Sequence, residues 1–552
     1  MAATDAVEVV TRQCEKGAES APRSKVSRKA TLGNVRLRNE ENNEIILIPT
    51  PSLDINDPLN WSQWRKKYVA TVLCVAMTMC NFLAAGPSIA IVRTAIDFFP
   101  QTAQSESLMT YAIPKVAYFF TSTSLLQGMG NLFWIPIANK WGRRPAYIAS
   151  YAIYFATAIW LIFEKSYSGF LVGRIIMGFG AGAAETLAPV TITDIFFLHE
   201  RGAVMSAYTC FLSIGVAFGM IVSGAITANK HWRTIYEVSS ALIGFVLLLL
   251  FFTLPETAYK RVENGKVIAS TSSEALRSRA SQSSNAETGQ PTVAKQTYLQ
   301  SLRIFRRQPL THESVLRMIF RPFALILLPS VLWAALVQAV TIGFLVAVSS
   351  NVDPAFEEAY RFQPWQVGLC FFAAIIGSLL GLPAGGKLGD FCADYLTTRN
   401  GGIREPEMRL PTIMISAITA PLALVLYGVG IQHRLHFLCP TVGLALLNFS
   451  ITQATTVCLV YVIDSYRPVA GEITLAVMGF KSLFGFLLSF ETNPWINKSG
   501  YQNAYGAMAG ISAAVIIMWI PLYLWGKTLR IRTWRWKVMS LVRWADDREI
   551  GE

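Results

Sequence analysis

The sequence predicts an all-α polytopic membrane protein that crosses the bilayer twelve times, in two bundles of six helices. Hydrophobic residues make up 53% of the 552 residues and charged residues only 15%, whereas about 25% of an ordinary soluble domain is charged. The apolar residues form long runs rather than amphipathic stripes, and about 20 such residues cross a hydrocarbon core of about 30 Å. A long polar segment separates the sixth run from the seventh.

These runs divide the chain into five regions. We expect an N-terminal tail (1–67), a first bundle (68–254), a central loop (255–321), a second bundle (322–526) and a C-terminal tail (527–552). The first tail is polar and resembles no cleavable signal, so we expect the first span to act as its own membrane anchor. The spans are expected at 68–93, 113–138, 145–163, 169–193, 202–227, 235–254, 322–349, 365–386, 410–431, 435–462, 470–491 and 503–526.

The basic residues predict the orientation of the chain, because cytoplasmic loops of membrane proteins carry an excess of Lys and Arg. With a cytoplasmic N-terminus, the tails and inner loops hold 38 of the 48 Lys and Arg, which leaves 10 for the outer loops and the spans. Both termini are therefore expected in the cytoplasm. The central loop is rich in serine and poor in apolar residues, so we expect a partly disordered tether between the halves or a site of phosphorylation.

Composition and motifs argue against several functions. The net charge of +13 would suit a nucleic-acid-binding protein, but the sequence holds no basic helix or aromatic–basic stretch that would form such a surface. It lacks the P-loop of ATP-driven pumps and the His-Glu-x-x-His pattern of zinc enzymes. The eight cysteines show no paired spacing. We expect no enzyme activity, metal, cofactor or nucleic-acid partner, and an ion gradient as the energy source.

Charged residues recur at matching places in the two halves, as in transporters built from repeats. Asn139-Lys-Trp-Gly-Arg-Arg-Pro145 follows the second span, and Gly385-Gly-Lys-Leu-Gly-Asp390 follows the eighth. The fourth and tenth spans end at acidic residues with an arginine just beyond. These charges predict either latches that open and close the cytoplasmic side or simple anchors. The expected gate residues are Arg143, Arg144, Asp194, Arg201, Asp390 and Asp464.

Short motifs follow one another in a fixed order over residues 57–491. They are Asp57-Pro-Leu-Asn-Trp-Ser62 with Trp64-Arg65-Lys66 before the first span, Gly142-Arg-Arg-Pro145 after the second, Arg174 with Gly178 and Gly180 in the fourth, Pro255-Glu-Thr257 after the sixth, Gly401-Gly-Ile-Arg-Glu-Pro-Glu-Met-Arg-Leu410 before the ninth and Tyr461-Val-Ile-Asp-Ser465 ending the tenth. In these segments the chain resembles the major facilitator superfamily, and more narrowly its fungal twelve-helix drug:proton antiporters. The resemblance implies two bundles that rock about a central cavity.

Two departures from the family pattern matter. Ile135 and Asn139 stand where the first-loop motif usually has Gly and Asp, so the latch of the first half loses an acidic member, although Asp194 can still meet Arg143 or Arg144. Exporters usually carry Gly-Pro and paired glycines in the fifth span, whereas this chain reads Gly219-Met-Ile-Val-Ser-Gly224. The sequence therefore lacks the motif that would indicate the direction of transport.

Three ionisable residues lie deep in the expected spans. Burying such residues in the membrane costs free energy, so they mark functional sites. They are Arg174, Glu185 and Lys481. The resemblance implies that Arg174 takes part in proton coupling, by holding a polar partner of the first span such as Asn81. We expect Glu185, in a stretch of small residues that leaves room around it, to carry the coupling proton or attract a cationic substrate. The alternative is a structural Glu185 neutralised by Lys481 or hydrogen-bonded to a neighbouring span.

Polar residues in other spans suggest a cavity lining. They are Gln127, Asn131, Gln338, Asn448 and Gln453. Aromatic residues could add contacts to a ligand, namely Tyr118, Trp333, Phe449 and Tyr461. For all of them, ordinary helix packing is the alternative.

The function predicted from these features is secondary transport in the plasma membrane by a monomer. We favour proton-coupled antiport that exports amphipathic small molecules such as drugs, fungicides, toxins or secondary metabolites. The first alternative is proton-coupled import of organic cations such as polyamines, which Glu185 and the altered fifth span favour. The second is a membrane sensor that does not transport, although the short polar tails offer no large cytoplasmic extension for signalling.

Overall fold

The computed structural model describes residues 33, 35–36, 48–49, 51–52, 54–102, 111–259, 297–303, 310–311, 313–537, 539 and 542. All of them belong to one unit, residues 33–552. The serine-rich part of the central loop, and with it the choice between tether and phosphorylation site, lies outside the described residues.

The described chain is built almost wholly of helices, which confirms the predicted fold class. The first half holds η2 (Pro58–Asn60), α2 (Gln63–Ala85), η3 (Gly86–Ala90), α3 (Ile91–Phe98), η4 (Pro100–Thr102), α4 (Ile113–Met129), α5 (Asn131–Trp141), α6 (Arg143–Phe163), α7 (Tyr167–Ile195), α8 (Arg201–Asn229) and α9 (Thr234–Thr253). After α12 (Tyr298–Ser301), the second half holds α13 (Val315–Leu325), α14 (Pro329–Tyr360), α15 (Pro364–Gly385), α16 (Lys387–Arg399), η6 (Pro406–Ile413), α17 (Met414–Gln432), α18 (Leu438–Ser465), η7 (Arg467–Val469), α19 (Ala470–Ile517) and α20 (Trp519–Thr533). The two-residue strands β1 (Val35–Arg36) and β2 (Ile403–Arg404) pair antiparallel.

Ten segments of the described chain are long and apolar enough to cross a membrane. The second predicted span is missing from the ten because it divides at Gly130 into α4 and α5. One of the ten, Ala470–Thr533, contains two predicted spans, and the chain leaves helical geometry between them at Gly500, where φ is 76°. These two features account for the difference between ten segments and twelve spans.

The seventh span differs from the prediction of 322–349. Residues 315–325 form the separate helix α13, and α14 begins at Pro329, whose fixed φ and missing N–H suit the first turn of a helix. α14 then continues to Tyr360. The prediction ended this span too early because Asp353, Glu357 and Glu358 make the last turns polar.

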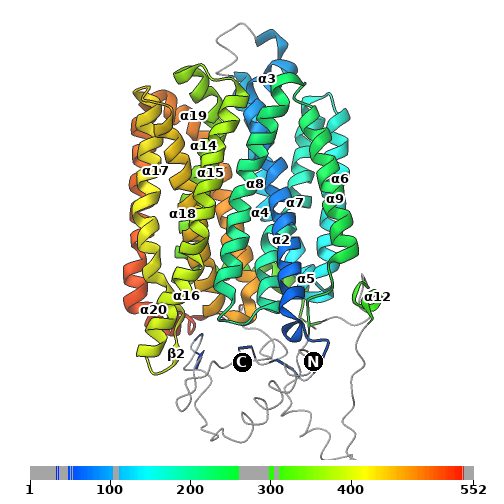
Figure 1. The fold of residues 1–552 in the computed structure, drawn as a ribbon, viewed down its shortest axis with the longest axis vertical. Helices are drawn as coiled ribbons and strands as arrows, with labels where there is room; N and C mark the ends of the chain where they lie inside the picture. Colours follow the sequence, from blue (N-terminus) through cyan, green and yellow to red (C-terminus); the bar gives the residue numbers. More distant parts are fainter. Residues whose placement is uncertain are drawn as a thin grey trace, which may run out of the picture. The chain divides into compact units, whose positions relative to one another are not determined.

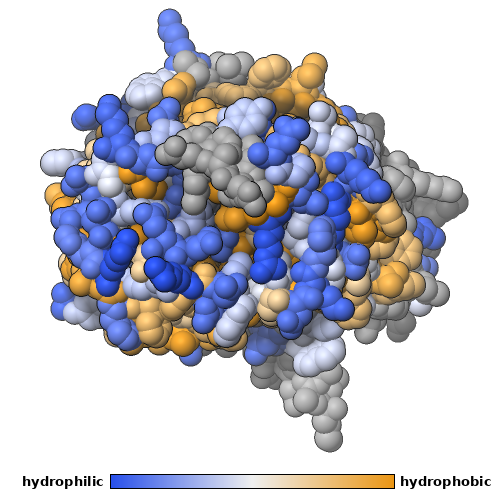
Figure 2. Space-filling model, turned by 90° about the horizontal axis from the view of Figure 1, so that it is seen from above, coloured by the Kyte–Doolittle hydropathy of each residue, from blue (hydrophilic) through white to orange (hydrophobic). Residues whose placement is uncertain are grey.

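The two halves lie side by side (Figure 1), and α8 packs against α15 and α18 where they meet, while α4 packs against α19. We call the end at which α2 begins and α20 finishes the basic end, and the other the opposite end. Figure 2 looks onto the opposite end, where hydrophilic side chains cover much of the face and hydrophobic ones gather at its rim. Large apolar side chains also lie exposed along the helices, for example Phe245, Leu380 and Leu524 at 62%, 61% and 62%. This distribution suits helices surrounded by lipid.

The small residues of α7 serve close helix packing. A Cβ atom on Gly182 would lie 2.3 Å from the backbone oxygen of Gln127 in α4, and one on Gly178 would lie 2.3 Å from that of Thr123. Helices that approach this closely need small residues at the contact. The prediction that these glycines leave room around Glu185 is therefore wrong, since they bring α7 against α4.

This contact predicts that Gly182→Ala destabilises the protein, because the new methyl group meets backbone rather than a movable side chain. We expect the free energy of unfolding to fall by about 1–3 kcal/mol, as at other overpacked sites. The measurement is the midpoint of thermal unfolding in detergent, which should be lower than that of the wild type. The matched control is Gly510→Ala, where nothing lies within 4 Å of the added Cβ. Equal unfolding midpoints for the two variants would contradict the prediction.

Candidate functional site

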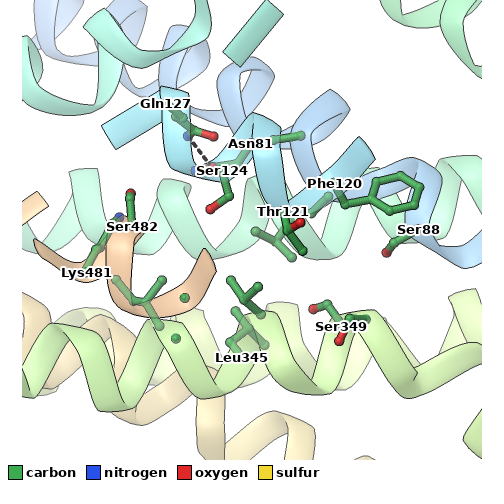
Figure 3. Close-up of a pocket in the computed structure, with 18 of the residues that line it drawn as sticks. Asn81, Ser88, Phe120, Thr121, Ser124, Gln127, Leu345, Ser349, Lys481 and Ser482 are labelled. Carbon is green, nitrogen blue, oxygen red and sulfur yellow. Dashed lines mark hydrogen bonds between the residues drawn. The ribbon is translucent and has the colours of Figure 1, made fainter. Parts of the chain in front are cut away.

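A cavity of about 90 Å³ lies between the two halves. Its walls come from α2, η3, α4, α7 and α8 of the first half and from α14 and α19 of the second. It begins at Glu185 and Lys481 and reaches Ser88 and Ser349, which lie farther toward the opposite end on η3 and α14. Figure 3 shows side chains of both halves facing one another across this space.

An ion pair between the halves forms the base of the cavity. The Lys481 ammonium of α19 donates to Oε1 of Glu185 in α7, and the two residues are only 6% and 2% exposed. The backbone carbonyl of Glu185 also accepts a 2.6 Å hydrogen bond from the Tyr208 hydroxyl. A buried pair of this kind is costly to break, because either charge left alone stays poorly solvated. The predicted neighbours Glu185 and Lys481 are thus brought together in the structure.

A bridge of amides lines the next part of the wall. Nε2 of Gln127 donates to Oδ1 of Asn81 over 2.9 Å, and Nδ2 of Asn81 donates to the Leu212 carbonyl over 3.3 Å. Figure 3 marks the Gln127–Asn81 bond. The bridge ties α4, α2 and α8 together at the cavity surface. Both amides therefore line the cavity.

Arg174 holds the first span by its backbone rather than by Asn81, which corrects the prediction. Its guanidinium donates to the carbonyls of Leu83, Ala84 and Phe119 over 2.9, 3.1 and 3.0 Å. In a continuous helix the N–H of residue 87 would donate to Leu83, but Pro87 has no N–H, and α2 gives way here to η3. Asn81 is already engaged by Gln127, so Arg174 satisfies the carbonyls that the helix break leaves free.

The Phe120 ring connects Arg174 to the cavity. The guanidinium carbon lies 5.0 Å from the centre of this ring, within the range of a cation–π contact, and Phe120 itself lines the cavity. The sequence analysis missed Phe120, along with Thr121 and Ser349, because apolar and hydroxyl residues are common in every span. The Gly86-Pro87 pair is the signal that could have located the helix break.

Four of the five predicted lining amides do not line this cavity. Asn131 accepts from Thr186 over 2.6 Å, Asn448 accepts from Ser213 over 2.5 Å, and Gln453 accepts from Ser416. Gln338 is fully buried, and neither amide atom has a hydrogen-bond partner within the described residues. These amides lie within helix contacts, so the packing alternative applies to them.

The predicted aromatic contacts also serve helix packing. Trp333 packs against Tyr461 and Tyr118 against Phe490, with ring centres 6.1 and 5.2 Å apart. Tyr118, Trp333, Phe449 and Tyr461 are all absent from the cavity wall.

Among the predicted gate residues, one ion pair crosses between the halves at the basic end. Arg201 at the start of α8 contacts Asp464 at the end of α18 over 3.4 Å, and both side chains are buried. Nearby, Ser206 donates to the Leu382 carbonyl over 2.6 Å, and the Thr209 and Thr456 hydroxyls lie 2.5 Å apart. The basic end is therefore closed by contacts between α8 and the second half.

The remaining gate residues pair within one half. Arg143 contacts Asp194 over 3.1 Å and also donates to Asn139, the residue that replaces the usual acid. Arg144 donates to the Phe251 carbonyl over 2.5 Å. In the second half, Asp390 accepts from Arg409 over 2.5 Å. The contact foreseen between Asp194 and Arg143 thus occurs.

Two further residues lie at this end, Glu256 of the Pro255-Glu-Thr257 motif and His199, which the sequence analysis did not name. Glu256, from the segment after α9, accepts from the backbone N–H groups of Arg143 and Arg144 over 2.9 and 3.2 Å, where an acidic group stabilises the start of α6. Burial lowers the pKa of His199 in the loop before α8. His199 is therefore uncharged at neutral pH, and Arg201 supplies the positive charge that meets Asp464.

A model of the Major Facilitator Superfamily matches residues 71–489. The chain belongs to the major facilitator superfamily. It is therefore a multi-pass membrane transporter of small molecules and not an enzyme. Within its described part, no group of three or more His, Cys, Asp or Glu residues could hold a metal ion.

Fungal members of the superfamily resemble the chain over most of its length. An uncharacterized MFS-type transporter of Schizosaccharomyces pombe is 23% identical over 89% of both chains. Protein HOL1 of Saccharomyces cerevisiae is 23% identical over 90% of this chain and 92% of its own. The MFS-type transporter penM of Penicillium rubens is 24% identical over 86% and 88%.

Solved structures support the fold. The human organic anion transporter MFSD10 (TETRAN) matches 82% of this chain and 99% of its own with a TM-score of 0.54 and 14% identity. The proton:xylose symporter XylE bound to 6-bromo-6-deoxy-D-glucose matches 84% and 97% with a TM-score of 0.57 and 13% identity. At this level of identity the likeness concerns the fold alone.

The carbonyl contacts of Arg174 predict that even Arg174→Lys destabilises this superfamily member. Lysine lacks the fork that reaches several carbonyls, and each hydrogen bond to a charged group contributes about 1.5–3 kcal/mol. The midpoint of thermal unfolding should therefore fall clearly below that of Arg399→Lys, a matched change at an exposed position. An Arg174→Lys protein as stable as the control would show that the carbonyl contacts contribute nothing.

The closed basic end predicts a second effect. In Asp464→Asn, Arg201 loses its anionic partner, so the balance should shift toward a state in which α8 separates from the second half. A cysteine introduced at Ser206, on the contact itself, should then react several-fold faster with a polar maleimide. Asp394→Asn is the control, because Asp394 pairs with Arg404 inside the second half. Equal labelling in both variants would leave Asp464 as an anchor.

Proposed function

We propose that this chain is a proton-coupled antiporter that exports amphipathic small molecules, as the drug:proton antiporters of its superfamily do. The observation that carries the proposal is the Glu185–Lys481 ion pair. These two residues supply all the charge on the cavity wall, and they come from different halves. A pair that spans the halves links its own protonation to their relative movement.

The chemistry of antiport follows from competition for the Glu185 carboxylate. A proton, the Lys481 ammonium and a cationic group of a ligand can each neutralise it, but they exclude one another. When a proton binds, Lys481 loses its partner and becomes a buried charge without compensation, which favours a rearrangement that exposes it to water. Proton binding and ligand release are thereby coupled.

The walls beyond the ion pair favour amphipathic ligands. Leu212, Val216, Ile342, Leu345 and Val346 offer apolar surface, and the Phe120 ring offers a flat face. Pockets for small molecules combine such surface with a few polar groups, here Asn81, Gln127 and the ion pair. The Lys and Arg distribution supports a cytoplasmic basic end. We propose in addition that the transporter acts as a monomer in the plasma membrane.

A second candidate is the import of organic cations. Glu185 is the one carboxylate on the cavity wall, and the cavity extends from it toward the opposite end, which is the extracellular end in this orientation. The altered fifth-span motif also removes the sequence mark of an exporter.

The deciding experiment measures movement of labelled tetraphenylphosphonium and labelled spermidine in cells with and without the protein, at two external pH values. Antiport predicts lower retention of the probe, and this difference disappears when the proton gradient is collapsed. Faster uptake at acidic pH would select the import of organic cations. Probe movement that does not depend on the proton gradient would contradict proton coupling in either direction.

Glu185→Gln should abolish gradient-driven movement of the probe, because the amide cannot take up the coupling proton, while leaving exchange of probe at equal pH. Glu491→Gln, an exposed change on α19, is the matched control. The double variant Glu185→Gln, Lys481→Met removes both charges and separates a folding defect from a coupling defect. A Glu185→Gln protein with unchanged pH dependence would remove Glu185 from the coupling mechanism.

A further inference from the structure

A second buried carboxylate lies beyond the cavity toward the opposite end. Asp353 in α14 is only 3% exposed. Three other buried acidic residues form direct ion pairs, Glu185 with Lys481, Asp464 with Arg201 and Glu472 with Arg321. Asp353 has no such ion pair within the described part of the chain. Burying a carboxylate that has no cation bound to it costs free energy, unless the carboxylate takes up a proton.

The charged residues that act on Asp353 come from both halves. The charge of Arg93, on α3 of the first half, acts on Asp353, as does that of Glu357 one turn farther along α14. α3 and α14 are in contact. Arg93 is held in place by the Thr227 carbonyl of α8, to which its guanidinium donates. Arg93 and Asp353 thus lie on contacting helices of the two halves and form no ion pair in the described chain, whereas the Arg201–Asp464 pair at the basic end is formed.

Hydroxyl groups lead from Asp353 into the cavity. Ser349 lies four residues before Asp353, on the same face of α14 and about 6 Å along its axis. Its hydroxyl, and that of Thr121 in α4, are buried without a hydrogen-bond partner among the described residues, and both side chains line the cavity. Figure 3 shows them on facing walls. Buried polar groups without a protein partner are commonly satisfied by water.

The helix is also weakened next to Asp353. Pro354 lies inside α14, and because it has no N–H it cannot donate to the carbonyl of Ser350, which is itself part of the cavity wall. This places Asp353 at a point where α14 can bend as the halves move.

We propose that Asp353 is a second proton-coupling residue, at which a proton from the medium at the opposite end enters on its way to Glu185. This inference rests on the proposed function. The proton leaves water for the Asp353 carboxylate while Arg93 stays apart. When the halves close at this end, Arg93 pairs with the carboxylate, and the proton passes through cavity water to Glu185, which gives up its bond to Lys481. No electrons are transferred, and one proton enters for each that leaves.

The first test needs no substrate. Dicyclohexylcarbodiimide reacts with protonated carboxyl groups in apolar surroundings. Mass spectrometry of the purified, reconstituted protein locates the adduct. We expect labelling of Asp353 that rises as the pH falls from 8 to 5, and none at the exposed Glu358. In Arg93→Gln the same labelling should occur at higher pH, by about one unit, because a cation near the carboxylate is lost. Absent or pH-independent labelling of Asp353 would overturn the proposal.

The second test measures transport of the probe that the wild-type protein moves. In Asp353→Asn, gradient-driven movement should fall at least tenfold, while exchange of probe at equal pH stays within twofold of the wild type, which also shows that the variant folds. Asp353→Glu should keep the gradient-driven rate, and Glu358→Gln is the matched control. A gradient-driven rate in Asp353→Asn within twofold of the wild type would overturn the proposal. A wild-type protein that moves neither probe would instead contradict the proposed function, and the labelling test then decides on Asp353.

Discussion

The Glu185–Lys481 ion pair is the interaction on which the rest of the arrangement depends. In a low-dielectric interior the two charges stabilise each other only while the halves hold them in contact, so the energy of the pair depends on the relative position of the halves. The surrounding structure supports this role. Tyr208 fixes the backbone at Glu185, and the Asn81–Gln127 bridge stiffens the adjoining wall. The wall of the cavity is otherwise free of charge, so no other cation on it competes with Lys481.

Two prolines lie in elements that line the cavity, η3 and α14. Pro87 lies where α2 gives way to η3 in the first span, and Pro354 lies inside the continuous helix α14 of the seventh, which is the equivalent span of the second half. In the first half the freed carbonyls are taken up by Arg174, which makes that break rigid. We see no buried arginine bonded in this way at Pro354 in the described residues. The proline of the first half thus marks a helix break that an arginine fixes, whereas the proline of the second half lies in a continuous helix without such an arginine among the described residues.

Much of the fold was predictable from the sequence, because the need to satisfy every backbone group in lipid leaves few choices besides helices. The twelve spans, the two halves and the buried charges Arg174, Glu185 and Lys481 follow from the apolar runs and their interruptions. The bounds of α14 did not follow, since a helix that leaves the lipid can continue through acidic residues such as Glu357.

The candidate site was less predictable. Which amides line a cavity depends on how each helix is rotated, and periodicity says little when all faces are apolar. Gln127 and Asn81 face the cavity, whereas Asn448 and Gln453 face neighbouring helices. The partner of Arg174 was wrong because side-chain pairing was considered and a backbone break was not. Asp353 was overlooked because it lies beyond the predicted end of its span.

The uninterrupted helix α8 has one more consequence. It runs from Arg201 to Asn229 without a proline, so no carbonyl along it is left without an N–H donor by a proline. Its contacts with the second half are hydroxyl groups at Ser206, Thr209 and Ser213, each about one turn from the next. On α18 the hydroxyl groups lie at Thr452, Thr455 and Thr456, and the hydroxyl of Thr456 meets that of Thr209. A contact made of hydroxyl groups can part and be taken over by water without leaving a charge unpaired, whereas opening the Arg201–Asp464 pair beside it leaves two charges to be solvated.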